Sequence, residues 1–141
     1  MKTIKLYWSM PIEIDDFFDS EERKDVGIYY ITRKHGNKET PLYIGMTSDS
    51  FNNRMKSHKY WLKEYRGKIF IRLGRIISPN WYEWDKHQQL IHETESLLIY
   101  NMRDILRENT TNTKSVFISE DTIVINYGHS SVIPKRITHY A

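Results

Sequence analysis

The chain has 141 residues, of which 39% are hydrophobic and 28% charged, a composition typical of one ordinary globular domain. It contains no cysteine, so disulfides and thiolate metal sites are excluded, and any metal must bind through oxygen or nitrogen. No apolar run approaches the roughly 20 residues of a membrane span, and the N-terminus is too short in apolar residues for a secretory signal. We therefore expect a cytoplasmic protein without membrane association.

The net charge of +3 is unevenly distributed along the chain. Residues 11–22 contain six acids and no Lys or Arg, whereas residues 51–75 contain eight Lys or Arg and one acid. The basic stretch also contains Tyr60, Trp61 and Tyr65, and basic residues interleaved with aromatic rings are typical of a phosphate-binding surface. A solvated helix face followed by a charged edge strand would give the same pattern. The charges alone therefore leave nucleic-acid binding open.

No internal repeat, low-complexity tract or Pro/Gly/Ser-rich linker divides the chain, so we expect a single domain. Residues 1–25 are interpreted as an N-terminal extension of a domain that occupies residues 26–141. The acidic cluster of this extension could shield a site or bind a partner.

Two strands are predicted to form a hairpin. Residues 26–32, VGIYYIT, are rich in β-branched and aromatic side chains, which favours a strand. The polar connection RKHGNKETP follows, and LYIGM at residues 42–46 is predicted as a second short strand, antiparallel to the first. Gly27 and Gly45 are expected to let the backbone pass close to a neighbouring strand or to a substrate.

A helix and a third strand are predicted after the hairpin. Thr47 or Ser48 is expected to cap a helix that runs from about residue 49 to residue 65. KIFIRLGRII at residues 68–77 predicts a strand. Three apolar side chains are expected on one of its faces: Ile69, Ile71 and Leu73.

The strongest helical pattern runs from Trp81 to about Leu106, with apolar residues recurring at helical spacing. NTTNTK at residues 109–114 ends it, and two strand-like runs follow at residues 122–126 and 132–137. We therefore predict an α+β fold, in which helices flank a small, mainly antiparallel sheet and the chain ends in a β-hairpin.

Five side chains on these elements could act together. Tyr29 and Tyr43 lie on the two hairpin strands, where their hydroxyls can share one face. Arg54 and His58 are four residues apart and therefore share a helix face. Glu95 lies at the border of an apolar stripe, where a carboxylate is costly to desolvate unless it meets a cation or a metal. Such a set suits phosphodiester hydrolysis, which needs an activated water, a metal on the phosphate and a fixed cation.

Each of these residues also has an ordinary structural interpretation, because strand tyrosines usually pack and helix arginines usually form surface salt bridges. Two other possible functional motifs are weaker. His92 begins a zinc-helix pattern, but no second histidine lies at the required turn. No glycine-rich loop suits the phosphates of a nucleotide.

The order and spacing of these residues resemble the GIY-YIG nuclease family. GIY at residues 27–29 and YIG at residues 43–45 are similar to the two half-motifs that name the family. Arg54 follows the second tyrosine by eleven residues, His58 follows Arg54 by one helical turn, and Glu95 stands before an apolar run. The resemblance covers well over half of the chain.

This resemblance implies a single Mg²⁺ or Mn²⁺ held by Glu95, the phosphate and waters, with Arg54 clamping the scissile phosphate. Tyr29 or Tyr43 would be the general base for the attacking water, with Tyr29 preferred, and His58 would assist proton transfer or bind phosphate. A phenol has a usual pKa of about 10, and a nearby metal and Arg54 would both favour the phenolate.

The resemblance also implies an asparagine beyond the long helix. Asn109 and Asn112 both lie near the expected place. Asn112 is chosen because it precedes the predicted last hairpin and could cross-link it to the site. Tyr30 points to the opposite strand face from Tyr29 and is expected in the core.

The sequence therefore predicts a divalent-metal-dependent endonuclease that hydrolyses DNA, with RNA left open as a further substrate. The alternative is a catalytically inactive nucleic-acid-binding module of the same fold, and a third interpretation is a protein-interaction domain. In a chain of 141 residues we expect no separate DNA-binding domain. Recognition is then expected from the N-terminal extension, the loop at residues 34–38, the C-terminal hairpin, a homodimer partner or a targeting protein.

Overall fold

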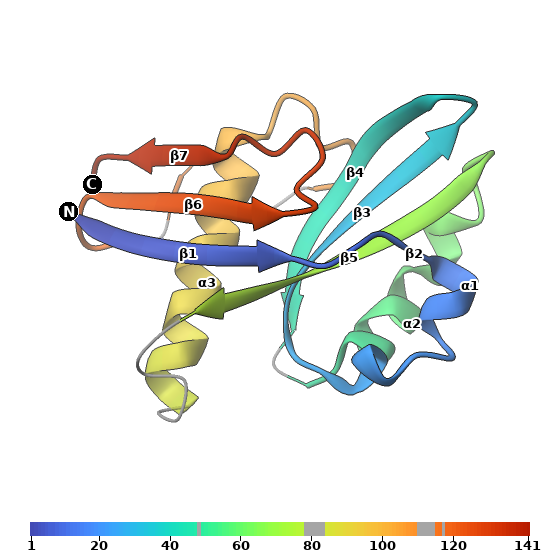
Figure 1. Cartoon of the computed structure of the whole chain (residues 1–141), viewed down its shortest axis with the longest axis horizontal. Coiled ribbons are helices and arrows are strands. Elements are labelled where there is room, and N and C mark those ends of the chain that lie inside the picture. The colour runs from blue at the N-terminus through green and yellow to red at the C-terminus, as the bar shows by residue number, and fades with distance from the viewer. Residues whose placement is uncertain (48, 78–83, 110–114, 117) are drawn as a thin grey trace.

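The computed structural model describes residues 1–47, 49–77, 84–109, 115–116 and 118–141. Within these residues the fold is α+β, as predicted, with seven strands in one curled sheet (Figure 1). The strands are β1 (Lys2–Trp8), β2 (Ile12–Glu13), β3 (Gly27–His35), β4 (Lys38–Thr47), β5 (Lys68–Ile77), β6 (Thr122–Gly128) and β7 (Arg136–His139). The helices are α1 (Ile14–Phe17), the 3-10 turn η1 (Glu21–Lys24), α2 (Phe51–Leu62) and α3 (Trp84–Asn101).

The sheet has the strand order β4-β3-β5-β1-β6-β7, and β2 pairs with β5. Every neighbouring pair is antiparallel except β1 and β6, which run parallel. The prediction of a mainly antiparallel sheet is therefore confirmed. The two chain ends lie beside each other at the β1–β6–β7 end of the sheet (Figure 1).

Residues 1–25 differ from the predicted extension, because β1 lies inside the sheet between β5 and β6. Its side chains alternate between buried and exposed: Ile4, Leu6 and Trp8 are buried, whereas Lys5 and Tyr7 are exposed. This period of two is the pattern of a strand with one face in the core. The rest of the segment adds β2, α1 and η1 to the same fold.

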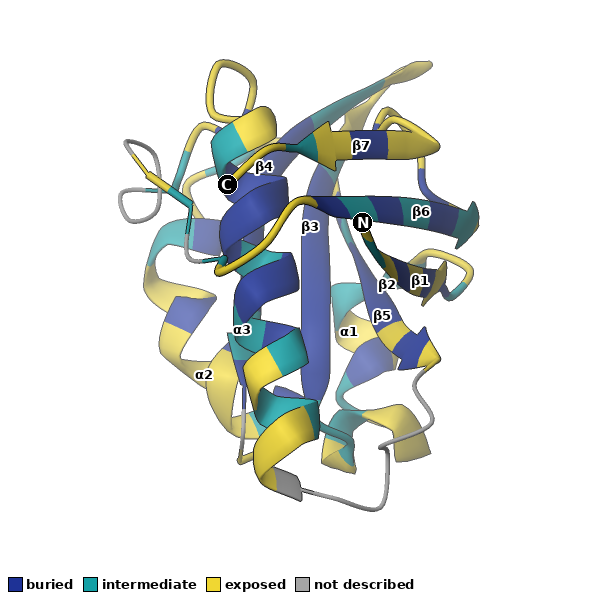
Figure 2. Ribbon diagram, turned by 90° about the vertical axis from the view of Figure 1, so that its left-hand side faces the viewer, coloured by how far each residue is buried: buried dark blue, intermediate teal, exposed yellow. Residues whose placement is uncertain are grey.

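Strand β3 separates two hydrophobic cores. Ile28 and Tyr30 face the core that contains α3, which confirms the prediction for Tyr30. Tyr29 and Ile31 face the core that contains α2. Figure 2 shows β3 buried along most of its length, with α3 against it. Tyr29 and Tyr30 are thus adjacent in sequence and on opposite faces of the sheet, each in a different core.

The hairpin is longer than predicted, because residues 33–41 belong mostly to its strands. Strand β3 continues to His35 and β4 begins at Lys38, so only Gly36 and Asn37 form the turn. Gly36 has φ +62°, a left-handed conformation that glycine adopts without steric cost.

The helix and strand boundaries are partly as predicted. The strand at residues 68–77 is confirmed to the residue, and its three apolar side chains share one core. Helix α2 is shorter than the predicted 49–65, and its cap is Ser50 instead of Thr47, since the Ser50 hydroxyl accepts from the Asn53 N–H at 3.1 Å. Ser48 lies outside the described residues.

Helix α3 and the last two strands also differ from their predicted ranges, and β6 runs to Gly128 instead of residue 126. Helix α3 ends at Asn101 instead of about Leu106, and residues 81–83 lie outside the described part. Strand β7 begins at Arg136 instead of residue 132. Asn126 explains this shift, because its side-chain amide donates to the Pro134 carbonyl at 2.9 Å and holds the preceding segment as a turn.

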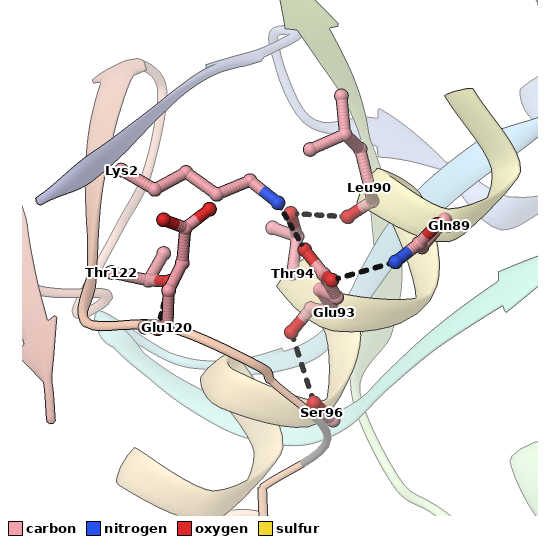
Figure 3. Close-up of polar contacts among 8 residues, drawn as sticks. All are labelled: Lys2, Gln89, Leu90, Glu93, Thr94, Ser96, Glu120 and Thr122. Carbon is pink, nitrogen blue, oxygen red and sulfur yellow. Dashed lines mark hydrogen bonds and ion pairs between the residues drawn. The ribbon is translucent and has the colours of Figure 1, made fainter. Parts of the chain in front are cut away.

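A buried ion pair joins the first strand to the long helix (Figure 3). Lys2 Nζ lies 2.6 Å from Glu93 Oε2, and the Gln89 amide donates to the other carboxylate oxygen at 3.2 Å. Glu93 is 2% exposed, so its charge depends on these two partners. The pair fixes α3 against the sheet on the side away from Glu95.

Candidate functional site

The candidate site lies at the free edge of β4, between α2 and α3. A cavity of about 680 Å³ opens there. It is lined by residues of all three elements and of the β4–α2 connection: Tyr43, Met46, Thr47, Asp49, Asn53, Arg54, Ser57, His92, Glu95 and Ile99. The structure therefore brings Tyr43, Arg54 and Glu95 to one cavity, although they are distant in the sequence.

Tyr29 and Tyr43 share the sheet face toward α2. Tyr29 pairs directly with Gly45, and Tyr43 pairs with Ile31, so the two tyrosines are diagonal neighbours. Their rings are stacked, with centroids 5.9 Å apart and planes inclined by 17°. A Cβ added at Gly45 would lie 2.4 Å from the Tyr29 hydroxyl oxygen. Glycine is needed there because the Tyr29 ring lies directly over its backbone.

Two side chains of α2 contact the Tyr29 hydroxyl. His58 Nε2 lies 2.8 Å from the Tyr29 oxygen, and the Arg54 Nε–H donates to the same oxygen at 3.3 Å. The four-residue spacing of Arg54 and His58 puts both on the turn of α2 that faces β3. The predicted cluster of Tyr29, Arg54 and His58 is thus a connected hydrogen-bond network.

Trp61 determines which nitrogen of His58 carries the proton. The Trp61 indole N–H donates to His58 Nδ1 at 3.0 Å, so Nδ1 must be an acceptor. Burial, together with the charge of Arg54, lowers the pKa of His58 to about 4, and the ring is therefore neutral near pH 7. A neutral ring with Nδ1 unprotonated carries its hydrogen on Nε2, which then donates to Tyr29.

Tyr29 itself is fully buried, whereas Tyr43 is half-buried and lines the cavity. Burial raises the pKa of the Tyr29 hydroxyl above its ordinary value, and Tyr43 raises it further, while the hydrogen bond and charge of Arg54 lower it. Tyr29 therefore has the two hydrogen-bond donors that would stabilise a phenolate, His58 and Arg54, whereas Tyr43 is the tyrosine that a water in the cavity would contact.

Glu95 projects from α3 toward the cavity on the opposite side from Arg54. Burial raises the pKa of its carboxyl to about 7, although the charge of Arg54 and a hydrogen bond from the Met46 backbone N–H both act to lower it. Two positions earlier on the same helix, Glu93 is neutralised by Lys2. Glu95 is thus a carboxylate whose charge the protein compensates only in part.

A divalent cation fits this environment. In the described part of the chain no three acidic or histidine side chains gather into a ready ligand set. Mg²⁺ is commonly bound through only one or two carboxylates, with waters and a substrate phosphate as its other ligands. Glu95 would be the protein ligand, and a cation beside it would favour the ionised carboxylate.

The outer edge of β4 is bonded by residues that follow α3. The Asn109 side chain accepts from the Ile44 N–H at 3.0 Å and donates to the Ile44 carbonyl at 2.7 Å, as a neighbouring strand would. The Glu108 N–H donates to the Leu42 carbonyl at 2.9 Å. Asn112, which was chosen from the sequence, lies outside the described residues. Asn109, the other candidate, thus fixes the strand that carries Tyr43.

The sequence interpretation misses two contributors to this site. It places Trp61 only in a basic, aromatic stretch, and nothing in its sequence context indicates a bond to His58. Asp49 lines the cavity and accepts from the Asn53 side-chain amide at 2.7 Å. His92, three residues before Glu95 and rejected as a metal partner from the sequence, lines the same cavity. A polar residue at the start of a helix was the available signal for Asp49.

The basic stretch at residues 51–75 divides into two groups. Arg72 is buried and paired with Glu39, and Arg75 is paired with Asp25 at 2.6 Å. The other six cations are exposed, and none of them forms an ion pair within the described residues: Arg54, Lys56, Lys59, Lys63, Arg66 and Lys68. They follow α2 away from the cavity toward the β3–β4 turn.

No family model, curated protein or solved structure matches this chain. Within the described residues, no helix combines the length and apolar character that crossing a membrane requires.

Replacing Glu95 with Gln is expected to stabilise the fold at and above neutral pH. The native carboxyl has a pKa of about 7 against an ordinary value of 4.5, so the native state binds this proton more tightly than the unfolded state. The resulting stability is fully present below pH ~4.5 and is lost as the pH rises through ~7. Between pH ~5 and ~8, the free energy of unfolding of Glu95→Gln should gain on the order of 2–3 kcal/mol over wild type, measured by urea denaturation.

The exposed Glu64→Gln variant is the matched control and should follow the wild-type pH dependence. His58 contributes an opposite trend below pH ~6.5, but it does so in all three proteins and cancels in the comparison. If the free energy of unfolding changes with pH in the same way in Glu95→Gln and wild type, burial of the Glu95 carboxyl does not destabilise the fold, which would contradict this prediction.

Replacing Trp61 with Phe is expected to release the His58 tautomer. In the wild type, ¹⁵N NMR of the imidazole should show Nε2 protonated and Nδ1 unprotonated down to a pH near the His58 pKa of about 4. Trp61→Phe removes the donor to Nδ1 and should give a mixture of tautomers. Trp8→Phe removes another buried indole N–H, which bonds Asn126 at 2.9 Å, and should leave the His58 signals unchanged. A single Nε2-protonated species in Trp61→Phe would show that another group sets the tautomer.

Proposed function

We propose that this protein is a divalent-metal-dependent endonuclease that hydrolyses phosphodiester bonds in DNA. One observation carries the proposal: Tyr43, Arg54 and the half-buried Glu95 carboxylate line one open cavity, and Arg54 is hydrogen-bonded to the buried Tyr29–His58 pair behind it. A base, a fixed cation and a carboxylate for a metal are the groups that this hydrolysis requires. Their order in the chain also resembles the GIY-YIG nucleases, which supports the same conclusion.

Arg54 and Glu95 would position the substrate. Arg54 is exposed at the cavity wall and always charged, so its guanidinium can bind a phosphate oxygen while its Nε–H stays on Tyr29. Glu95 would hold Mg²⁺ or Mn²⁺ beside the same phosphate. When bound, the metal would polarise the phosphate and lower the pKa of the attacking water.

The proton acceptor would be the Tyr29–Tyr43 pair instead of Tyr29 alone. His58 is a donor at Nε2 and an acceptor at Nδ1, so it cannot take a proton from Tyr29 without losing one of these bonds. Tyr29 therefore loses its proton toward Tyr43 and the cavity. The pair then titrates as one unit, with its negative charge held by His58 and Arg54.

Tyr43 is the member of this pair that meets the attacking water. As the water oxygen attacks phosphorus, one water proton passes to the Tyr43 oxygen, and the Tyr43 proton passes to the Tyr29 phenolate through the hydrogen bond between the two side chains. The bond to the leaving oxygen breaks, and that oxygen takes a proton from solvent water. This assignment differs from the sequence-based preference for Tyr29, because Tyr29 has no exposed surface in the cavity. His58 stabilises the phenolate in this scheme and neither relays a proton nor contacts the phosphate.

The exposed lysines of α2 support a polymeric substrate. Lys56, Lys59 and the C-cap Lys63 follow one another at spacings of three and four residues, so they share one face. This face is turned about 180° around the helix axis from Arg54, so it would contact a different part of the substrate from the phosphate at the cavity. A small phosphate ester would fill the cavity alone and would have no use for cations that far from it.

The direct test is cleavage of supercoiled plasmid and branched DNA with Mg²⁺, Mn²⁺ or EDTA. Wild type should nick DNA only with metal, and Glu95→Ala should lose cutting while it keeps DNA binding. Tyr43→Phe and Tyr29→Phe should each lower kcat by roughly 10²–10⁴-fold, since general-base catalysis contributes about that factor. The kcat of Arg54→Lys should also fall steeply, because lysine lacks the Nε–H donor that reaches the Tyr29 hydroxyl.

Asn53→Ala serves as a control at the cavity wall that carries none of the proposed chemistry, and it should stay within a few-fold of wild type. Salt-sensitive DNA binding without any cleavage by the wild type would favour the alternative, an inactive nucleic-acid-binding module. Full activity of Glu95→Ala would exclude the proposed metal ligand.

A further inference from the structure

The β1–β6–β7 half of the sheet has one face without a helix. Helix α3 packs behind these strands, while no described helix lies in front of them (Figure 1). Helices α1 and α2 cover only the other half of the sheet, over β3 and β5. The open face is formed by the exposed alternate side chains of β1 and β6, together with those of β7 and the end of β5.

Two stacked tyrosines form one row of this face. Tyr7 and Tyr127 are register partners on β1 and β6, with ring centroids 4.7 Å apart and planes inclined by 13°. Tyr7 is 45% exposed, and a hollow of about 260 Å³ opens beside it. Ring pairs that hold each other on a sheet surface lose little entropy when a further flat ring stacks on them.

The next row of the face is cationic and apolar. Lys5 pairs in register with Ile77 on one side and Ile125 on the other, and Ile125 pairs with Arg136. Lys5 and Arg136 have no ion pair within the described residues. No strand position on this face holds Asp or Glu. The acids at its borders include Asp25, which pairs Arg75 at 2.6 Å, Glu22 in the hollow, and Asp121 before β6, which accepts from the Ala141 N–H at 2.9 Å.

We propose that this face, defined by Lys5, Tyr7, Tyr127 and Arg136, binds single-stranded DNA. Its bases would stack on the Tyr7–Tyr127 pair, and its phosphates would meet Lys5 and Arg136. Aromatic rings beside cations on an open sheet are suited to unpaired bases, whereas a duplex hides the base faces that such rings contact. Glu22 in the hollow can accept a hydrogen bond from the amino group of a stacked base.

Charge decides against a second copy of the chain as the occupant. In a two-fold dimer through this face, the central Lys5 of each copy would approach its own symmetry mate or Arg136, and no strand position of the face carries an acid to neutralise them. An anionic strand neutralises these cations instead.

This face is separate from the proposed catalytic cavity. Strand β6 is four positions from β4 in the sheet order, or about 19 Å at the usual strand spacing. The binding does not depend on catalysis, and only the choice of DNA over RNA rests on the proposed function. A nuclease with such a face would act where an unpaired strand leaves a duplex.

The test is fluorescence anisotropy with a labelled oligothymidylate of about 10 nucleotides, without metal, so that no cleavage interferes. The double variant Tyr7→Ala/Tyr127→Ala should lower affinity about 5-fold to 100-fold, and the Tyr→Phe pair should retain it because the rings remain. The slope of log K for binding against log salt concentration should become shallower by about 0.7 in Lys5→Gln and by about 0.7 in Arg136→Gln, since each variant loses one phosphate contact.

Tyr100→Ala is the matched control. Tyr100 lies on α3, behind the sheet, and its ring centroid is 4.2 Å from the Arg103 guanidinium, so it is a tyrosine–cation pair away from the open face. Affinity should be unchanged in this variant. If the alanine pair unfolds the chain, Lys5→Gln and Arg136→Gln still decide the question, because both side chains are exposed.

Equal affinity of wild type, the alanine pair, Lys5→Gln and Arg136→Gln would overturn the proposal. Tighter binding of an oligouridylate of the same length than of the oligothymidylate would also overturn it. So would a wild-type dimer in sedimentation that persists when DNA is added and dissociates in the Lys5→Glu variant. Loss of plasmid nicking without loss of oligonucleotide binding would instead concern the catalytic cavity, so failure of this proposal and failure of the nuclease proposal are distinguishable.

Discussion

The outward-facing peptide groups of β4 are the constraint around which the candidate site is built. An edge strand leaves alternate N–H and C=O groups without a strand partner, and these must be bonded by other groups when they are buried. Here Glu108 bonds Leu42, Asn109 bonds both groups of Ile44, and Glu95 receives the Met46 N–H. The residue that satisfies the last position of the edge is also the proposed metal ligand, so completing the sheet edge and placing the carboxylate are one structural event.

The two glutamates of α3 show how the fold treats a charge that it uses structurally and one that it leaves for a ligand. Glu93 is buried against Lys2, and its position joins the first strand to the helix. Glu95 is partly buried, and its raised pKa reports that the protein does not fully stabilise its ionised form. Such a cost is unnecessary for folding but useful for binding a cation. Tyr29 shows the same feature, because a phenol buried beside Arg54 and His58 is held in a state that only a changed charge in the cavity would ionise.

Local patterns predicted the parts of this fold that depend on neighbouring residues. The strand at residues 68–77, the β3–β4 pairing and the burial of Tyr30 follow from alternation of apolar side chains. The parallel pairing of Lys2–Trp8 with Thr122–Gly128 could not be predicted, because nothing local relates strands at opposite ends of the chain. For the same reason the sequence identified Arg54, His58 and Glu95 by type and spacing, but not Trp61 behind His58 or the reach of Asn109 to Ile44. Contacts of a single side chain across the fold leave no periodic signal.

The most direct measurement of the central claim is paramagnetic broadening of the backbone NMR signals by Mn²⁺ in the presence of a cleavage-resistant phosphorothioate DNA. If Glu95 holds the metal beside the bound phosphate, the Met46 amide, which donates to this carboxylate, should broaden first, followed by the signals of Tyr43 and Arg54. The same titration of Glu95→Gln should leave these signals sharp. Broadening centred on the acidic residues 11–22, or equal broadening in both proteins, would contradict a metal site at the edge of β4.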